Sequence, residues 1–195
     1  MNNISQRQNE PNQLVRLASQ RRIYSDAKLI QGLHMTLSVP CVIALSFLVA
    51  INPDLAGIAA SWGILVAVGD LVWLTPWQKS LAKTAATIQE LFDCDVLDIV
   101  WNDIAVGRRP EMETVAAAAK RYRKKEPTLE TLRNWYPVQL DKLPIHLARI
   151  ACQRANCWWD AQLRRRYSSF LTAAVISLAG VVFLIGFIGG YTLEK

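Results

Sequence analysis

The sequence predicts an all-α membrane protein with an N-terminal transmembrane hairpin, a mainly helical cytoplasmic insertion, and a long helix that continues into a third transmembrane span. The first observation is three long apolar runs, at residues 33–51, 55–74 and 170–191. About 20 apolar residues, at a rise of about 1.5 Å each, cross a hydrocarbon core of about 30 Å. The second is that most of the charge lies in residues 76–169. The third is that residues 145–179 contain no Pro or Gly, so one helix can join the polar segment to the third run.

The chain is expected to divide into five segments. They are residues 1–32 as a cytoplasmic N-terminal arm and juxtamembrane helix, 33–75 as the transmembrane hairpin, 76–169 as the cytoplasmic helical domain, 170–191 as the third transmembrane helix, and 192–195 as a tail. The arm and the insertion hold 21 of the 22 Lys and Arg residues, whereas the turn at residues 52–54 holds none. Because cytoplasmic loops carry an excess of positive charge, we expect a multi-pass plasma-membrane protein whose N-terminus and central domain are cytoplasmic.

The first span follows a polar arm. Residues 1–12 are rich in Asn and Gln and have little to bury, so we expect them to be disordered. Apolar positions in residues 14–33 recur at helical spacing and predict a helix that leads into the first span. Pro40 is expected to kink this span or to mark where it begins. The short turn at residues 51–54 makes the first two spans an antiparallel hairpin.

The insertion is expected to contain several short helices. A helix at residues 78–92 starts it. A short extended or buried piece follows, favoured by Val96, Ile99 and Val100. Pro110 begins another helix, because Pro suits the first turn. The predicted inward face of that helix consists of Met112, Val115, Ala119 and Tyr122. Pro144 then opens the long helix.

The water-facing half of the long helix carries two stripes. One is apolar and consists of Ile145, Ala148, Cys152, Ala155 and Trp159. The other is polar and consists of His146, Arg149, Gln153, Asn156, Asp160 and Arg164. Since nothing in the sequence interrupts the helix before the third span, we expect a movement of the polar half to be transmitted to the membrane.

The polar stripe supplies the candidate ligand site. Its donors suit a phosphate or the edge of a base, while an aromatic ring stacks on that base. The candidate residues are Arg149, Gln153, Arg154, Asn156, Trp135 and Tyr136. Arg149 and Arg154 are five residues apart and cannot point at one spot on a single helix, so a shared ligand would need two packed helices or subunits. A solvated or intersubunit polar face is the other interpretation of the stripe.

Asp70 and several Gly residues are the candidates within the spans. An ionisable residue inside a membrane marks a functional site, so Asp70 either takes part in gating or is hydrated or paired near the interface. Small residues four positions apart let helices approach closely, which predicts packing within one subunit or in a homo-oligomer. These ridges are Ala59, Gly63 and Ala67 in the second span, and Gly186 with Gly190 in the third.

Enzymatic chemistry is not expected. The sequence has no Walker A, GxSxG, HExxH or CxxC motif. Asp93 and Asp95 would share one face of a strand and suit Mg²⁺, but capping and ion pairing are commoner uses of such carboxylates. Cys94 with His146 stays open as a nucleophile and its base, although a structural His is more common. The four Cys residues give no disulfide framework, and we expect no metal and no cofactor.

Four stretches of the sequence carry a resemblance to a known family. They are RLASQRRIYSDAKLIQ, IQELFDCDVLDIVWND, WYP and LPIHLARIACQRANCWWDAQLRRRY. In this order they resemble the SMODS-associated four-transmembrane (S-4TM) effector family of bacterial pore-forming proteins. The likeness covers nearly the whole chain.

The resemblance implies a pore-forming or membrane-disrupting effector in the inner membrane of a bacterium, with a cyclic oligonucleotide as its activator during anti-phage defence. Its implied functional partner is a cyclic-oligonucleotide synthase. The apolar runs and the small-residue ridges predict contact with the lipid bilayer and a homo-oligomer, and we expect no binding of nucleic-acid polymers. A non-enzymatic membrane anchor that recruits a protein partner is the alternative. The family has two spans after the insertion and this sequence has one, so we expect either truncation before the fourth span or a three-span variant.

Overall fold

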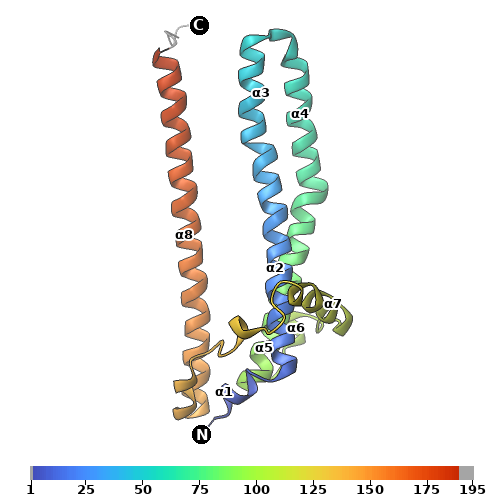
Figure 1. Ribbon diagram of the computed structural model, residues 1–195, viewed down its shortest axis with the longest axis vertical. Helices are drawn as coiled ribbons and strands as arrows, with labels where there is room; N and C mark the ends of the chain where they lie inside the picture. Colours follow the sequence, from blue (N-terminus) through green and yellow to red (C-terminus); the bar gives the residue numbers. More distant parts are fainter. Residues whose placement is uncertain (1, 189–195) are drawn as a thin grey trace. The chain divides into compact units, whose positions relative to one another are not determined.

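The computed structural model describes residues 2–188, and every regular element within them is a helix (Figure 1). The chain forms two units, Met1–Lys142 and Leu143–Lys195. Within the described residues, three helical stretches are long and apolar enough to cross a membrane, namely Pro11–Ile51, Pro53–Leu97 and Ile145–Leu184. The predicted all-α membrane fold is therefore confirmed.

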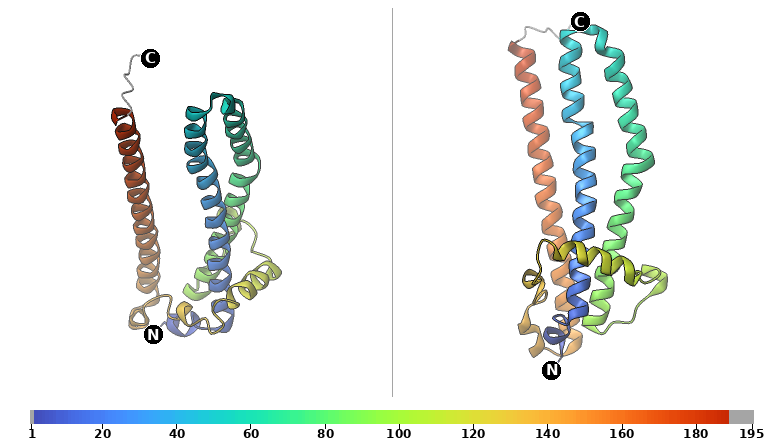
Figure 2. Two further views of the ribbon diagram at one scale, coloured as in Figure 1. Left: turned by 45° about the horizontal axis from the view of Figure 1, so that its top comes forward. Right: turned by 45° about the vertical axis from the view of Figure 1, so that its right-hand side comes forward.

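The first span is a helix that is broken at Pro40. α2 (Pro11–Ser38) runs from the polar end of the first unit into the apolar run, and α3 (Pro40–Ile51) continues it. Pro has no N–H and its ring crowds the preceding turn, so a regular helix does not pass through this position. The turn η1 (Pro53–Leu55) follows, and α3 packs against the next helix. The predicted hairpin is confirmed (Figure 2).

The second span continues into the insertion without a break. α4 (Ala56–Gly69) is followed by a π-helical turn, η2 (Asp70–Leu74), and then by α5 (Thr75–Leu97). The helix predicted at residues 78–92 is present, but α5 is longer at both ends and includes Pro76. The Thr75 N–H donates to the Asp70 carbonyl five residues back, and this wider turn lies directly before the Pro ring.

The extended piece predicted after this helix is partly wrong. Val96 lies in the last turn of α5 and is buried, whereas Val100 is 89% exposed. The helix ends at Asp98, whose backbone is left-handed with a φ of 55°. Residues 99–102 alone leave the helical conformation before the short helix α6 (Asp103–Val106).

The polar end of the first unit has a small core between α2, α5 and α7 (Met112–Arg123). The core consists of Ile23, Ala85, Ile88, Val115 and Ala118, all of them buried. The inward face predicted for α7 is right at Val115 and Ala119. It is wrong at Met112, which is 79% exposed because it stands at the very start of the helix. The short turns η3 (Glu130–Leu132) and η4 (Val138–Lys142) complete the unit.

The N-terminal arm is folded from residue 2 onward, so the prediction of disorder is wrong for residues 2–12, and residue 1 lies outside the described residues. The arm forms α1 (Ile4–Arg7), and Ile4 is buried. The side chain of Gln8 is also fully buried. It donates to the Tyr136 carbonyl at 3.0 Å and accepts from the Tyr136 N–H at 2.7 Å. Burial of this amide is tolerated because both of its polar ends are hydrogen-bonded.

Further hydrogen bonds join the same two segments, and we call the whole set the amide clasp. They run from Asn2 to Leu140, from Ser5 to Val138 and Asp141, and between Asn9 and Asn134. The clasp ties the residues before α2 to the residues that lead into the second unit. Polar side chains thus supply contacts that an apolar core supplies elsewhere.

Gln8→Ala is expected to lower the free energy of unfolding by about 1–3 kcal/mol, because it removes two hydrogen bonds from a buried backbone segment. Gln6→Ala is the matched control, since Gln6 is exposed, and it should change stability by less than about 0.5 kcal/mol. Thermal unfolding in detergent, followed by Trp fluorescence, measures both variants. Equal stabilities would show that the clasp contributes nothing.

The second unit is built on one helix. α8 (Ile145–Ile188) is 44 residues long and begins directly after Pro144, as predicted. Gly186 belongs to this helix, whereas Gly190 and the tail lie outside the described residues.

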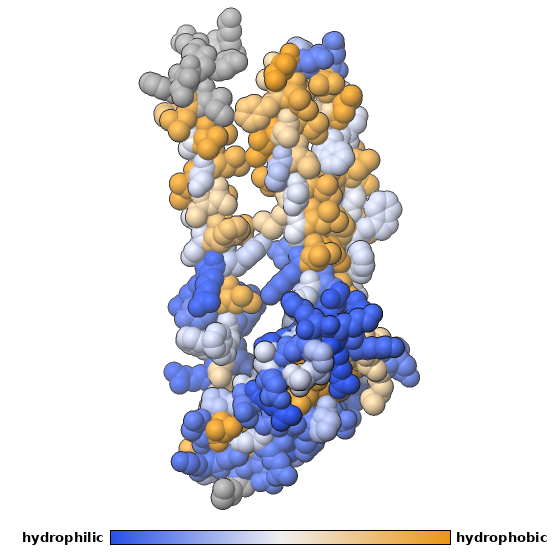
Figure 3. Space-filling model, in the orientation of Figure 1, coloured by the Kyte–Doolittle hydropathy of each residue, from blue (hydrophilic) through white to orange (hydrophobic). Residues whose placement is uncertain are grey.

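In the first unit, apolar residues cover α3 and α4, and hydrophilic residues cover the opposite end (Figure 3).

Candidate functional site

A polar pair lies inside the transmembrane hairpin. Nδ1 of His34 in α2 lies 3.2 Å from a carboxylate oxygen of Asp70, and the Thr75 hydroxyl donates to the same oxygen at 2.9 Å. Asp70 is also the first residue of the π-helical turn η2. Such turns interrupt the regular hydrogen-bond ladder and are frequent at functional sites. The hairpin therefore holds the carboxylate of Asp70 by one partner from each span.

The sequence pointed to Asp70 but not to His34 as its partner. The signal lay in the register of the hairpin. His34 is 19 residues before Pro53 and Asp70 is 17 residues after it, so antiparallel helices bring the two to nearly the same depth. Pairing reduces the cost of an ionisable group in lipid, which fits a structural role. A gating role for Asp70 stays a prediction.

Gly63 lies open on the surface of the hairpin. A Cβ atom at this position would meet no atom within 4 Å, so the hairpin does not need Gly here for its own packing. The spans meet elsewhere on α4, where Val66 is buried and the Trp62 indole donates to the Leu37 carbonyl at 3.4 Å. The packing role predicted for Gly63 therefore concerns a helix outside this hairpin and stays a prediction.

The two candidate stacking rings of the first unit already have contacts. Tyr136 is 1% exposed, and its hydroxyl donates to the Asp93 carboxylate at 2.5 Å. Trp135 packs edge-on against Phe92, and the Arg21 guanidinium lies 5.6 Å from the centre of its ring. Tyr136 is thus a core residue. A base that stacked on either ring would compete with these contacts, and the ligand role of the pair stays a prediction.

The other four candidates lie on α8. Arg149, Gln153 and Asn156 follow one another at spacings of four and three residues, which places them along one edge of the helix. Arg154 lies off this edge. One copy of α8 therefore does not bring Arg149 and Arg154 to one spot, in line with the sequence-based expectation that a shared ligand needs a second helix.

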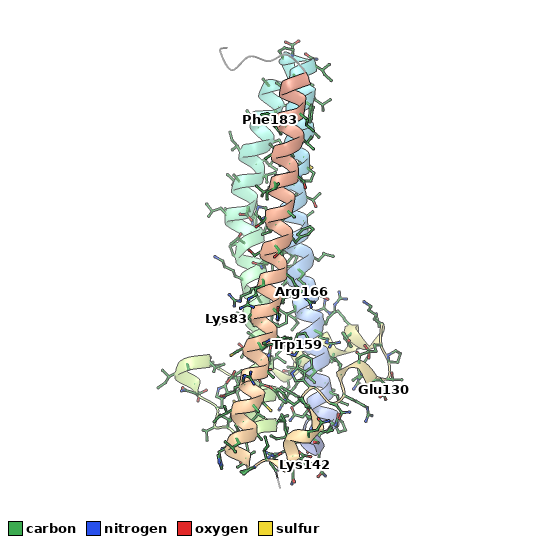
Figure 4. The ribbon with its side chains drawn as sticks, turned by 90° about the vertical axis from the view of Figure 1, so that its left-hand side faces the viewer. Lys83, Glu130, Lys142, Trp159, Arg166 and Phe183 are labelled. Atoms are coloured by element: carbon green, nitrogen blue, oxygen red, sulfur yellow. The ribbon has the colours of Figure 1, made fainter. Side chains whose placement is uncertain are left out.

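Arg154 instead lies beside two exposed indole rings. A shallow depression on α8 is lined by Ala151, Arg154, Ala155, Trp158 and Trp159. The two Trp rings meet edge-on with their centres 4.8 Å apart, and Figure 4 shows the position of Trp159 on the helix. An Arg beside an open aromatic face can bind a phosphate while a base stacks. Trp159 was predicted to belong to the apolar stripe and was therefore not among the candidate ligand residues.

Cys94 does not have the character of a nucleophile. Burial, followed by the negative charge of Glu90, raises the pKa of its thiol to about 11. The thiol also donates to a carboxylate oxygen of Glu90 at 3.8 Å. Since the thiolate is the reactive form, the raised pKa disfavours a nucleophilic role for this sulfur at neutral pH.

The Mg²⁺ interpretation of Asp93 and Asp95 assumed a strand, and that premise is wrong. Both residues lie in α5, where positions two apart point to different sides of the helix. Asp93 accepts from a core Tyr hydroxyl, and Asp95 forms an ion pair with Arg16 of α2. These carboxylates therefore serve packing between segments.

Comparison with known proteins places these features among membrane effectors. The profile of the family described as the SMODS-associating 4TM effector domain matches residues 2–195. A probable CBASS effector molecule of Bacillus cereus (strain VD146) is 22% identical over 196 residues, which cover 97% of this chain and 65% of that protein. The chain thus spans slightly less than two thirds of that relative's length. No solved structure matches the chain.

Proposed function

The chain belongs to the SMODS-associating 4TM effector family, and from this premise we propose that it is the membrane effector of a bacterial anti-phage system that signals by cyclic oligonucleotides. In this proposal a synthase supplies the nucleotide, the polar segment binds it, and the spans permeabilise the inner membrane. The N-terminus and residues 76–169 lie in the cytoplasm. The similarity to a probable CBASS effector supports the setting.

The observation that carries the proposal is the continuity of α8. Its polar part holds Arg149 and Arg154, and its apolar part is one of the three stretches able to cross a membrane. Sharp bends in helices come from Pro, Gly or π turns, and residues 145–179 contain no Pro or Gly. A tilt or rotation caused at Arg149 therefore reaches the bilayer as the movement of one rigid rod.

Charge supports the same ligand class. Residues 76–169 hold 16 Lys and Arg against 11 Asp and Glu, an excess of five positive charges. A cyclic oligonucleotide carries one negative charge per phosphate, so this field raises its local concentration and its rate of association.

Dye leakage from liposomes that contain the full chain tests the proposal. Purified cyclic di- and trinucleotides are added one at a time, and release of dye is expected with one of them and not without nucleotide. Liposomes that stay intact with every nucleotide, while the polar segment captures a protein partner, would favour the membrane-anchor alternative.

The proposed topology predicts how the cysteines react. Cys157 is exposed on the polar half of α8, so an impermeant thiol reagent should label it after lysis but not in intact cells. Cys94 should stay unlabelled after lysis until the protein is unfolded, because it is buried and its pKa is about 11. Its residual rate should rise about tenfold per pH unit from pH 8 to 10, as the thiolate fraction does. Labelling of Cys157 from outside intact cells would reverse the topology.

We propose that the active form is a homo-oligomer with Gly63 at an interface between copies. Gly63→Leu should then reduce crosslinked oligomers and leakage together, while the hairpin stays stable because the site is open. Gly57→Leu is the matched control, since Gly57 is also open on α4 but lies off the ridge. Identical crosslinked ladders for the two variants would remove this ridge from the interface.

A further inference from the structure

The C-terminal end of α7 and the two residues after it carry a dense positive charge. Five of the six residues 120–125 are basic and exposed, namely Lys120, Arg121, Arg123, Lys124 and Lys125. Val115 and Ala118 hold the opposite side of the helix in the core against α2 and α5. Figure 2 shows α7 lying across α2, and Figure 3 shows hydrophilic side chains gathered over it. We call these five residues the basic surface of α7.

Nearby acidic residues neutralise only part of this surface. The carboxylate of Asp26 is shared between Arg22 at 2.8 Å and Arg121 at 2.9 Å. Glu126 accepts hydrogen bonds from the hydroxyl and the N–H of Thr131, which hold its pKa below the ordinary value. Within the described residues, no ion pair involves Lys120, Lys124 or Lys125.

The ion pair between Arg121 and Asp26 places the C-terminal end of α7 beside this part of α2. Asp26 lies seven residues before the apolar run that begins at Leu33, which is about 10 Å along α2. The headgroup layer extends about 5–8 Å beyond the hydrocarbon core. Lys and Arg side chains cover the remaining few ångström by snorkelling. On α5, the exposed Lys79 and Lys83 follow the second run by five and nine residues.

We propose that the basic surface of α7 binds the phosphates of anionic lipid headgroups in the membrane that holds the hairpin. Position selects lipid over a soluble phosphate, because the surface is within reach of headgroups whenever the hairpin is inserted. The contact holds α7, and through the shared core α2 and α5, against the bilayer. It rests on the membrane location in the proposed function and is independent of leakage.

The test places a nitroxide on α7 in the full chain. Ala117→Cys is introduced after the four native cysteines are replaced by Ala, since Ala117 is exposed and lies two turns from Lys124. The protein is reconstituted without nucleotide in phosphatidylcholine vesicles or in a phosphatidylcholine and phosphatidylglycerol mixture. Both contain a nickel-chelating lipid that speeds relaxation of a nearby nitroxide. A second nitroxide, at Ile58 in α4, verifies insertion by its accessibility to oxygen.

Relaxation at position 117 is expected to be about three times faster in the anionic vesicles, and this difference should vanish in 1 M NaCl, where the Debye length is about 3 Å. Lys124→Glu should reduce the difference at least twofold. The matched change Lys142→Glu should not, because Lys142 lies at the end of the first unit remote from the hairpin tip (Figure 4).

Three outcomes would overturn the proposal. One is equal relaxation in neutral and anionic vesicles when position 58 is inserted. Another is an equal reduction of the difference between neutral and anionic vesicles in the Lys124→Glu and Lys142→Glu variants. The third is loss of the difference on adding millimolar inorganic triphosphate at constant ionic strength, which would assign the surface to soluble phosphates.

Discussion

Replacing Arg149 by Ala is expected to abolish the leakage that depends on the cyclic oligonucleotide, while expression and membrane insertion stay unchanged. Arg149 and Gln153 lie one turn apart on α8, where both can bind one ligand. A guanidinium offers two parallel hydrogen bonds to a phosphate. A hydrogen bond to a charged group contributes about 1.5–3 kcal/mol, so its loss weakens binding by about 10- to 150-fold.

The proposed switch leaves little margin for that loss. Moving a population from about 1% to 99% active needs about 5.5 kcal/mol of differential binding. If the substitution removes about 3 kcal/mol of binding free energy, less than half of the molecules would be active when each subunit switches alone. In an oligomer every subunit loses the same binding free energy. We therefore expect leakage to fall to background.

Two control variants separate recognition from charge. Arg149→Lys keeps the charge but not the planar fork, so it should bind more weakly than wild type and better than Arg149→Ala. Arg165→Ala removes a positive charge near the third span and should leave nucleotide binding unchanged. Calorimetry measures nucleotide binding, and dye release measures leakage. Wild-type binding and leakage by Arg149→Ala would exclude this edge of α8 as the signal site.

The membrane part of the fold was predictable from the sequence because lipid leaves the backbone few choices. A chain in hydrocarbon must satisfy its N–H and C=O groups within a helix, so the length of an apolar run fixes the span. The break at Pro40 and the start of α8 after Pro144 follow from the missing N–H of Pro. Pro76 does not break its helix, since the π turn directly before it keeps the helix continuous.

The polar part was less predictable because distant partners decide it. Gln8 is buried only because Tyr136, 128 residues away, offers both a carbonyl and an N–H. Local composition at residues 1–12 predicts disorder and holds no sign of that partner. Tyr136 was selected as a stacking ring for the same reason, since nothing near it in the sequence reveals its burial. Asp70 could be predicted from the sequence because a carboxylate within an apolar run is unusual whatever its partner is.

The second large effect is expected at Asp70. Asp70→Ala removes the partner of His34 and the acceptor for Thr75 within the hairpin. Interhelical hydrogen bonds in membranes are worth up to about 1.7 kcal/mol, which is about a 20-fold change in an equilibrium. We therefore expect nucleotide-dependent leakage to fall by up to about 20-fold, with insertion retained.

A double-mutant cycle isolates the contact between the spans. Asp70→Ala, His34→Ala and the double variant are compared by thermal unfolding in bicelles. A coupling energy of at least about 0.6 kcal/mol is expected, because each single change leaves the other polar group without its partner in the apolar run. Strictly additive effects would mean that the pair does not join the spans. Thr75→Val reports the contribution of the bond at the π turn alone.

Asp70→Asn separates a gating role from a purely structural one. Asn keeps a side-chain oxygen for His34 and Thr75 but carries no charge, so the hairpin should keep most of its stability. We expect leakage to change nonetheless, because η2 begins at Asp70. Loss of the extra residue in this turn would convert it to a regular α-helical turn and rotate all of α5 by about 100° relative to α4. The carboxylate of Asp70 lies at the first residue of that turn. Wild-type leakage at wild-type stability would leave Asp70 a structural role only.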